Sequence, residues 1–224
     1  MSELPEDHPG TPRERYRAQI REEIKQAALR QLAQLGPAGI SVNAIGKELG
    51  VSGPALYRYF ASRDELLTEL VIDAYIDLAD ALRAALEQTP RRAQRRRFET
   101  LARSYRSWAL AEPHRYRLLF GPPLPGFDAN ADRLNRAANA SMELLVDTLP
   151  NPTSRWRPTA ALAEQLSRWS DMGGFQVQSS NGLRAVLGWA HVHGFVSLEI
   201  AGNYASMGLD PELLFEAELR ELWG

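Results

Sequence analysis

The 224-residue sequence predicts an all-α protein, with a small N-terminal unit of three helices followed by a larger helical unit. Apolar residues recur every three or four positions along most of the chain, which is the spacing of helices that bury one face. Pro and Gly residues interrupt this pattern and indicate where the helices end. The length is sufficient for two units with separate apolar cores.

The first predicted helix covers residues 13–35, because its apolar residues from Ile20 to Leu35 lie on one stripe. We expect residues 1–12, which contain three prolines, to form a disordered arm. Ser62 and Glu65 have the spacing of a capping box, and an apolar-periodic helix follows them. We therefore expect a first domain over residues 13–63 and a second domain over residues 64–224.

Residues 41–60 predict two short helices joined by a tight turn. Ser41 is a favourable N-cap, and Gly50 can take the left-handed conformation that ends a helix. Ser52 is placed to cap the second helix, whose first turn tolerates the missing amide donor of Pro54. This arrangement is typical of a helix-turn-helix, which inserts its second helix into the DNA major groove. The spacing alone fits any compact helical hairpin equally well.

The same region resembles the signature of the TetR family of bacterial transcriptional regulators. The resemblance is carried by residues 40–67, which read ISVNAIGKELGVSGPALYRYFASRDELL. A weaker resemblance lies downstream, where Trp189, His193 and Gly194 match the Trp…His-Gly (WHG) pattern of one group of TetR C-terminal domains. The resemblance implies a ligand-responsive homodimer. Such proteins are commonly repressors, which a small-molecule effector releases from a palindromic operator in double-stranded DNA. The absence of cysteine is compatible with the reducing cytoplasm, where we expect the protein.

The resemblance also implies which residues of the helix-turn-helix contact DNA. Phosphate contacts position such a protein, whereas contacts with base edges select the sequence. The expected phosphate contacts are Ser41, Tyr57, Tyr59 and Arg63. The expected base-side positions are Ser52, Gly53, Pro54, Ala55 and Arg58. Among these, Arg58 can reach a guanine with two hydrogen bonds, although a phosphate contact is equally compatible with its chemistry.

The charge distribution agrees with a DNA-binding first domain. The whole chain has a formal net charge of −2. Residues 11–63 contain nine basic and four acidic residues, however, which gives this segment a net charge of +5. A second basic run at residues 91–97, RRAQRRR, is interpreted as a solvated loop and helix start rather than as a contact with flanking DNA.

The second domain is expected to consist of further helices, including residues 129–149, 157–172, 182–205 and 210–222. The helix at 182–205 has two apolar stripes. One contains Leu187, Ala190 and Gly194, and the other contains Trp189 and His193. A helix that is apolar on two faces is buried on both, so one face can pack within the subunit and the other against a second copy.

A small-molecule pocket is expected in this domain, because aromatic walls with a few polar groups are typical of ligand sites. The candidate lining residues are Trp108, Tyr116, Leu119, Phe120, Trp169, Met172, Phe175, Trp189 and His193. Each of these residues is equally compatible with an ordinary core position, and His193 with a buried, hydrogen-bonded histidine.

Other functional classes receive little support. The chain lacks cysteine and contains no Walker A, G-x-S-x-G, H-E-x-x-H or glycine-rich dinucleotide motif, so we expect no enzyme, no cofactor and no metal. His191 and His193 lie on opposite faces of a helix and cannot chelate one ion together. No apolar stretch is long enough to span a membrane. The alternative is a helical interaction or scaffold protein, which would leave the basic, tyrosine-rich segment near Arg58 unexplained.

Overall fold

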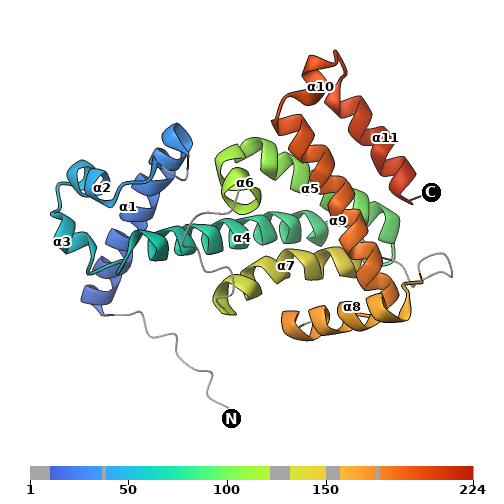
Figure 1. Ribbon diagram of the computed structural model, residues 1–224, viewed down its shortest axis with the longest axis horizontal. Helices are drawn as coiled ribbons and strands as arrows, with labels where there is room; N and C mark the ends of the chain where they lie inside the picture. The colour runs from blue at the N-terminus through green and yellow to red at the C-terminus, as the bar shows by residue number, and fades with distance from the viewer. Residues whose placement is uncertain (1–10, 37–38, 122–131, 150–156, 175–176, 224) are drawn as a thin grey trace, which may run out of the picture. The chain divides into compact units, whose positions relative to one another are not determined.

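The computed structural model describes residues 11–36, 39–121, 132–149, 157–174 and 177–223. Apart from a 3-10 turn at Gly39, every regular element in these ranges is an α-helix, which confirms the predicted fold class (Figure 1). The helices are α1 (Pro12–Leu35), α2 (Val42–Leu49), α3 (Gly53–Leu56), α4 (Arg63–Glu87), α5 (Gln94–Ala111), α6 (Pro113–Phe120), α7 (Asp132–Thr148), α8 (Ala160–Gly173), α9 (Ser179–Ile200), α10 (Asn203–Ser206) and α11 (Pro211–Trp223). Within the described ranges, no helix is both long and apolar enough to cross a membrane.

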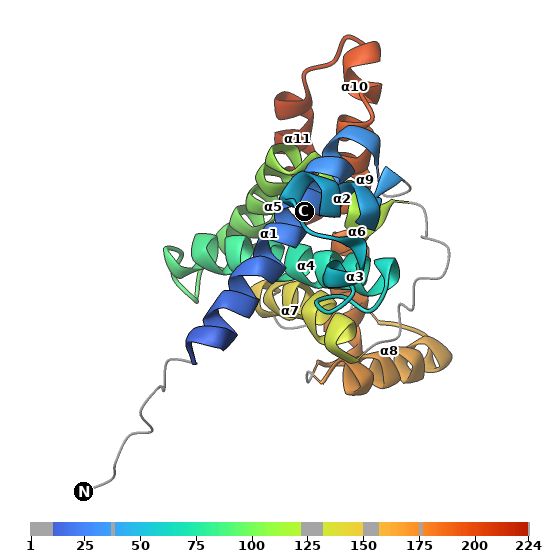
Figure 2. The same ribbon diagram turned by 90° about the vertical axis from the view of Figure 1, so that its left-hand side faces the viewer.

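The chain divides into two compact units, and α4 begins in the first and continues into the second. The first unit extends to Leu70 and contains α1, α2 and α3. Helix α2 contacts both α1 and α3, and the two short helices lie side by side in both views (Figures 1 and 2). The core of the first unit takes buried apolar residues from each of its helices. They include Ile24, Ala28 and Leu32 of α1, Ile45 of α2, Leu56 of α3, Phe60 after it, and Leu66 and Leu67 of α4.

Side chains define where the helices of the first unit begin. Thr11 accepts a hydrogen bond from the Glu14 amide at 3.3 Å, and the Glu14 carboxylate accepts one from the Thr11 amide at 2.7 Å. These reciprocal bonds form a capping box at the start of α1. Ser41 caps α2 as predicted, because its hydroxyl accepts from the Ala44 amide at 3.3 Å.

Two capping predictions need correction. Ser52 occupies the N-cap position of α3, but its hydroxyl caps no amide there. Helix α3 is a single turn, and the Ser52 carbonyl instead accepts from the amides of Ala55 and Leu56. At α4, the Ser62 hydroxyl accepts from the Glu65 amide at 3.0 Å as predicted, but the Glu65 carboxylate accepts from the amide of Ala61.

The second unit has its core between α4, α5, α7, α9 and α11. Phe98, Tyr105 and Trp108 of α5 pack there with Phe195 of α9 and Phe215 of α11. The predicted helix at 182–205 is too long, because α9 ends at Ile200. Gly202 follows with a φ of 78°, a left-handed conformation that glycine adopts without steric cost, and the short α10 begins after it.

Candidate DNA-binding surface and ligand cavity

The turn between α2 and α3 depends on two glycines. Gly50 ends α2 in the left-handed region with a φ of 68°. The Gly46 carbonyl accepts a hydrogen bond from the Val51 amide at 2.9 Å. A Cβ atom on Gly46 would lie 2.8 Å from the Val51 carbonyl oxygen, which is closer than real Cβ contacts. The chain can therefore fold back tightly after α2 only if residue 46 lacks a side chain.

The residues expected to contact DNA lie on α3, on its C-terminal extension and at the adjacent helix starts. Those that are exposed are Ser41, Ser52, Pro54, Tyr57 and Arg58, and those of intermediate exposure are Gly53, Ala55, Tyr59 and Arg63. Tyr57 is 50% exposed although its neighbour Leu56 is buried. The segment thus presents hydroxyls and one guanidinium to its surroundings, which are groups able to bind phosphates and base edges.

Arg63 has an internal contact that the sequence did not predict. Its Nε donates to the Ile40 carbonyl at 3.0 Å, which links the start of α4 to the residue before the α2 cap. The same guanidinium also forms an ion pair with Asp64 at 3.8 Å, so a phosphate would have to share it with these internal partners. The phosphate contact of Arg63 therefore stays a prediction, and any substitution there also removes a contact that supports the fold.

Two arginines of α1 bind carbonyl groups at the end of the α3 segment. Arg17 donates to the Arg58 carbonyl at 3.3 Å, and Arg21 donates to the Tyr59 carbonyl. The Arg21 guanidinium also lies 4.2 Å from the centre of the Phe60 ring. Cationic donors are favourable beside the unsatisfied carbonyls of a helix C-terminus. Sequence reasoning missed this role, because the paired residues are 41 and 38 positions apart and no local pattern connects them.

The second unit contains a cavity of about 200 Å³ among α4, α5, α6, α7, α8 and α9. Its walls are mainly aliphatic and aromatic. The lining residues are Tyr75, Leu78, Leu82, Leu101, Tyr105, Phe120, Ala138, Asn139, Ser141, Met142, Leu145, Trp169, Gly188, Trp189 and Val192. A concave apolar site with a few polar groups is the usual form of a small-molecule site.

Of the nine residues predicted to line a pocket, some line the cavity, some lie directly behind its wall and the others lie elsewhere. Phe120, Trp169 and Trp189 lie in the cavity wall. Tyr116 and His193 lie directly behind it, with ring centres 5.2 and 4.9 Å from that of Phe120.

The other four predicted pocket residues have different surroundings. Trp108 is buried in the core, and its indole N–H donates to Asp77 at 2.8 Å. Leu119 packs against the same core. Met172 is 80% exposed, because its position on α8 faces away from the packed side. Phe175 lies outside the described residues.

His193 joins α5, α6 and α9 behind the cavity wall. Its Nδ1 lies 3.0 Å from the Tyr105 hydroxyl and 3.2 Å from the Tyr116 hydroxyl, and its ring is stacked on Trp189. Burial lowers the pKa of His193, and it raises the pKa values of Tyr105 and Tyr116. All three rings are therefore uncharged near neutral pH, and the imidazole can accept a hydrogen bond from one of the hydroxyls.

Four polar wall residues were missed from the sequence, namely Tyr75, Tyr105, Asn139 and Ser141. Tyr105 comes from α5. The other three come from α4 and α7, and only tertiary packing brings them beside α9. Across the described ranges, no group of three or more His, Asp or Glu side chains is placed to hold a metal ion.

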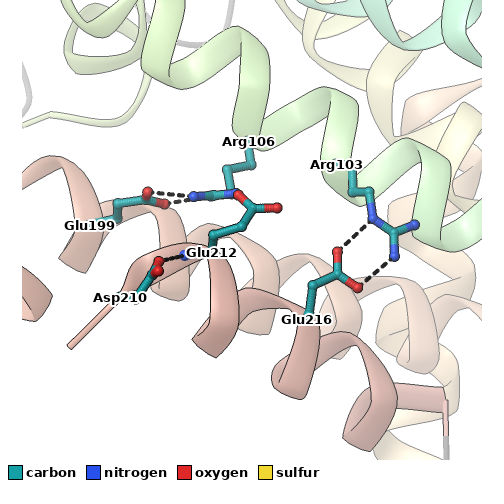
Figure 3. A network of polar contacts seen from close by, with 6 residues as sticks. All are labelled: Arg103, Arg106, Glu199, Asp210, Glu212 and Glu216. Carbon is teal, nitrogen blue, oxygen red and sulfur yellow. Dashed lines mark hydrogen bonds and ion pairs between the residues drawn. The ribbon is translucent and has the colours of Figure 1, made fainter.

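Two arginines of α5 hold α11 in the second unit (Figure 3). Arg106 donates two hydrogen bonds to Glu199 of α9, at 2.7 and 2.8 Å, and a further one to Glu212 of α11. Arg103 donates two bonds to Glu216 of α11, at 2.8 and 2.9 Å. Paired bonds between a guanidinium and a carboxylate fix the relative orientation of the two groups. The network therefore sets the position of α11 against α5 and α9.

A glycine-dependent helix-turn-helix in one unit and an apolar cavity in the other define a class of DNA-binding transcriptional regulators. Comparison with known families agrees. Residues 24–70 match the model of "Bacterial regulatory proteins, tetR family", and residues 98–222 match "Tetracyclin repressor-like, C-terminal domain". The chain therefore belongs to the tetR family and is a DNA-binding transcriptional regulator. The Trp…His-Gly grouping stays a prediction.

Individual relatives support the same assignment. The chain is 37% identical over 214 residues to the HTH-type transcriptional regulator Rv1816 of Mycobacterium tuberculosis, and the match covers 92% of each chain. It is 43% identical to SCO4313, a protein assigned a regulatory role, whose crystal structure superposes with a TM-score of 0.79 and matches 95% of this chain and 98% of that one. A protein of unknown function from Rhodococcus sp. RHA1 is 25% identical, with a TM-score of 0.68 over 98% of this chain and 97% of that one.

These findings disfavour a scaffold protein without DNA binding. Regulators of the tetR family typically form dimers, respond to small molecules and are not enzymes.

Proposed function

We propose that the protein is a homodimeric repressor that binds a palindromic operator in the cytoplasm, carries out no catalysis, and is released when a small molecule enters the cavity of the second unit. The observation that carries this proposal is the segment Ser52–Arg58, which exposes Ser52, Pro54, Tyr57 and Arg58 and is held between a glycine-dependent turn and the two arginines of α1.

The DNA contacts follow from the exposure of this segment. Arg58 is exposed, and only its backbone carbonyl is bound by Arg17, so the guanidinium can extend to a guanine edge or a phosphate. Ser41, Tyr57 and Tyr59 offer hydroxyls to phosphates, together with Arg63. Ser52, Gly53, Pro54 and Ala55 lie nearest the bases and have small side chains. We therefore expect part of the sequence preference to come from DNA shape.

The two stripes of α9 support the homodimer. His193 and Val196 on one stripe pack inside the second unit, although Trp189 on the same stripe is 36% exposed. The other stripe leaves Leu187 38% exposed and Leu198 47% exposed, with Ala190 and Gly194 between them. Small residues between exposed leucines allow a second helix to approach closely. A dimer is also what a palindrome requires, because each recognition helix reads one half-site.

The proposed dimer surface can be tested with one pair of variants. Leu187→Glu places a charge on the exposed stripe of α9, and we expect size-exclusion chromatography with light scattering to show a monomer with lost operator binding. Leu213→Glu is the matched control, because Leu213 is 71% exposed on α11. This control should stay dimeric. A dimeric Leu187→Glu protein would disprove this interface, and a wild-type monomer that binds operator DNA would disprove the homodimer.

A further inference from the structure

The lining of the cavity restricts the chemistry of its ligand. None of the described lining residues is Asp, Glu, Lys or Arg. Burial raises the pKa of Tyr75 and of Tyr105, so both phenols stay protonated near neutral pH. An ionised group that enters such a site loses its hydration and finds no counter-charge, which costs far more than burying a neutral polar group. The walls therefore favour an uncharged ligand.

The volume restricts the size of the ligand. An apolar cavity of about 150 Å³ is sufficient to bind benzene, whereas sites for drug-sized ligands measure about 300–1,000 Å³. The cavity of about 200 Å³ thus matches one substituted ring or a branched chain of similar bulk. Trp169, Trp189 and Phe120 supply aromatic faces and edges against which such a ring can pack.

Ser141 indicates that the ligand also has a polar group. It belongs to the cavity wall on α7, and its buried hydroxyl oxygen has no hydrogen-bond partner among the described residues. Buried polar groups in native proteins are nearly always hydrogen-bonded, so an unpartnered one needs an explanation. Asn139 lies two residues before it and also lines the cavity. A ligand hydroxyl or carbonyl that enters beside these side chains would supply the missing partner.

We propose that the effector is an uncharged, largely apolar molecule of about single-ring size that carries one hydroxyl or carbonyl group, bound between the tryptophans and Ser141. This inference rests on the proposed function, since it concerns the ligand of the same cavity. It goes beyond that function by defining the charge, size and polar group that the site selects.

The test uses three probes of similar size, namely 4-methylphenol, toluene and 4-methylbenzoate. Binding to the wild-type protein near neutral pH is followed by tryptophan fluorescence, because Trp169 and Trp189 line the cavity, and by isothermal titration calorimetry. We expect saturable binding of 4-methylphenol with a Kd below about 1 mM, and binding of 4-methylbenzoate weaker by a factor of about 10 or more. Equal binding of the carboxylate, or no binding of either neutral probe, would overturn the inference.

Two pairs of variants locate the bound probe. Ser141→Ala should weaken the binding of 4-methylphenol by a factor of about 3–10 and leave the binding of toluene unchanged. Ser107→Ala, on an exposed face of α5, should change the affinity for neither probe. Ala138→Leu should fill the cavity and abolish binding of both, whereas Ala84→Leu on an exposed face of α4 should not. Thermal melting checks that each variant is folded. Unchanged binding in both cavity variants would contradict the assigned site.

The binding test does not involve DNA, so its failure is separate from failure of the proposed function. If no neutral probe binds but another compound releases the protein from its operator, the ligand class is wrong and the repressor function stands. If 4-methylphenol binds in the cavity but the protein selects no DNA sequence, the ligand class stands and the repressor function is wrong.

Discussion

The Tyr105 hydroxyl lies 3.0 Å from Nδ1 of His193, and this contact joins α5 to α9 directly behind the cavity wall. Tyr105 itself lines the cavity, and His193 is stacked on Trp189, which lines it too. The pair therefore connects the candidate ligand site with the helix whose outer stripe is proposed to form the dimer. The contact is compatible with a neutral imidazole whose Nδ1 accepts a hydrogen bond, which agrees with the lowered pKa of His193.

This contact predicts a specific pH dependence of stability. The pKa of His193 is lower in the folded protein than its ordinary value of about 6.5, so the unfolded chain takes up a proton first as the pH falls. The His193 contribution is fully present above about pH 6.5 and is lost progressively below it. Urea unfolding at several pH values should show that the free energy of unfolding declines as the pH falls. This decline should be smaller in His193→Gln than in the wild-type protein. Equal declines in both proteins would contradict this assignment.

We expect a methyl group added at Gly46, beside the turn before α3, to have a large effect on stability and on operator binding. Gly46→Ala forces the new Cβ against the Val51 carbonyl, so we expect a loss of about 1–3 kcal/mol of stability and weakened binding to operator DNA. Gly182→Ala is the control, because a Cβ on this α9 residue would make ordinary contacts of 3.6 Å. Thermal melting and fluorescence anisotropy measure the two effects. If both variants behave alike, the turn does not depend on Gly46.

The arginines that hold α11 predict unequal effects on stability. Arg106→Ala leaves Glu199, whose side chain is 9% exposed, without its partner, and we expect a loss of about 3 kcal/mol or more. Arg103→Ala breaks a pair whose side chains are 44% and 35% exposed, and we expect a loss of about 1 kcal/mol or less. Urea unfolding compares the two variants. A greater loss for Arg103→Ala would reverse the assigned importance of the two pairs.

We expect substitution of Arg58 to change the sequence preference of DNA binding rather than to lower the affinity for all sequences uniformly. If its guanidinium binds a guanine with two hydrogen bonds, Arg58→Ala should reduce discrimination at one operator position by about 1–3 kcal/mol. Arg58→Lys keeps the charge but loses the paired geometry, so it should retain affinity better than specificity. Anisotropy titrations with single-base operator variants measure this effect. Equal weakening on every sequence would instead identify Arg58 as a phosphate contact.

The parts of the fold predicted from the sequence are those governed by local chemistry. Ser41 and Gly50 act on amides and carbonyls within a few residues, so their capping roles follow from sequence position alone. The end of α9 was misplaced because Ala201 continues the apolar pattern beyond Ile200, and only backbone geometry shows the interruption at Gly202.

The candidate sites were predicted less completely, because they depend on packing between distant segments. The bonds from Arg17 and Arg21 to the end of the α3 segment leave no periodic signal in the sequence. Met172 and Trp189 are both large apolar residues on predicted helices, yet the first faces outward and the second lines the cavity. Periodicity assigns residues to helix faces but does not say which face meets a cavity.

The most direct test of the regulator function is selection of binding sites from random duplex DNA by the purified wild-type protein at about 100 mM salt. We expect a palindrome whose two half-sites are about one helical turn, ~34 Å, or a multiple of that distance apart, as a symmetric dimer requires. Recovery of no sequence motif, or of a single half-site without symmetry, would contradict the proposed dimeric repressor.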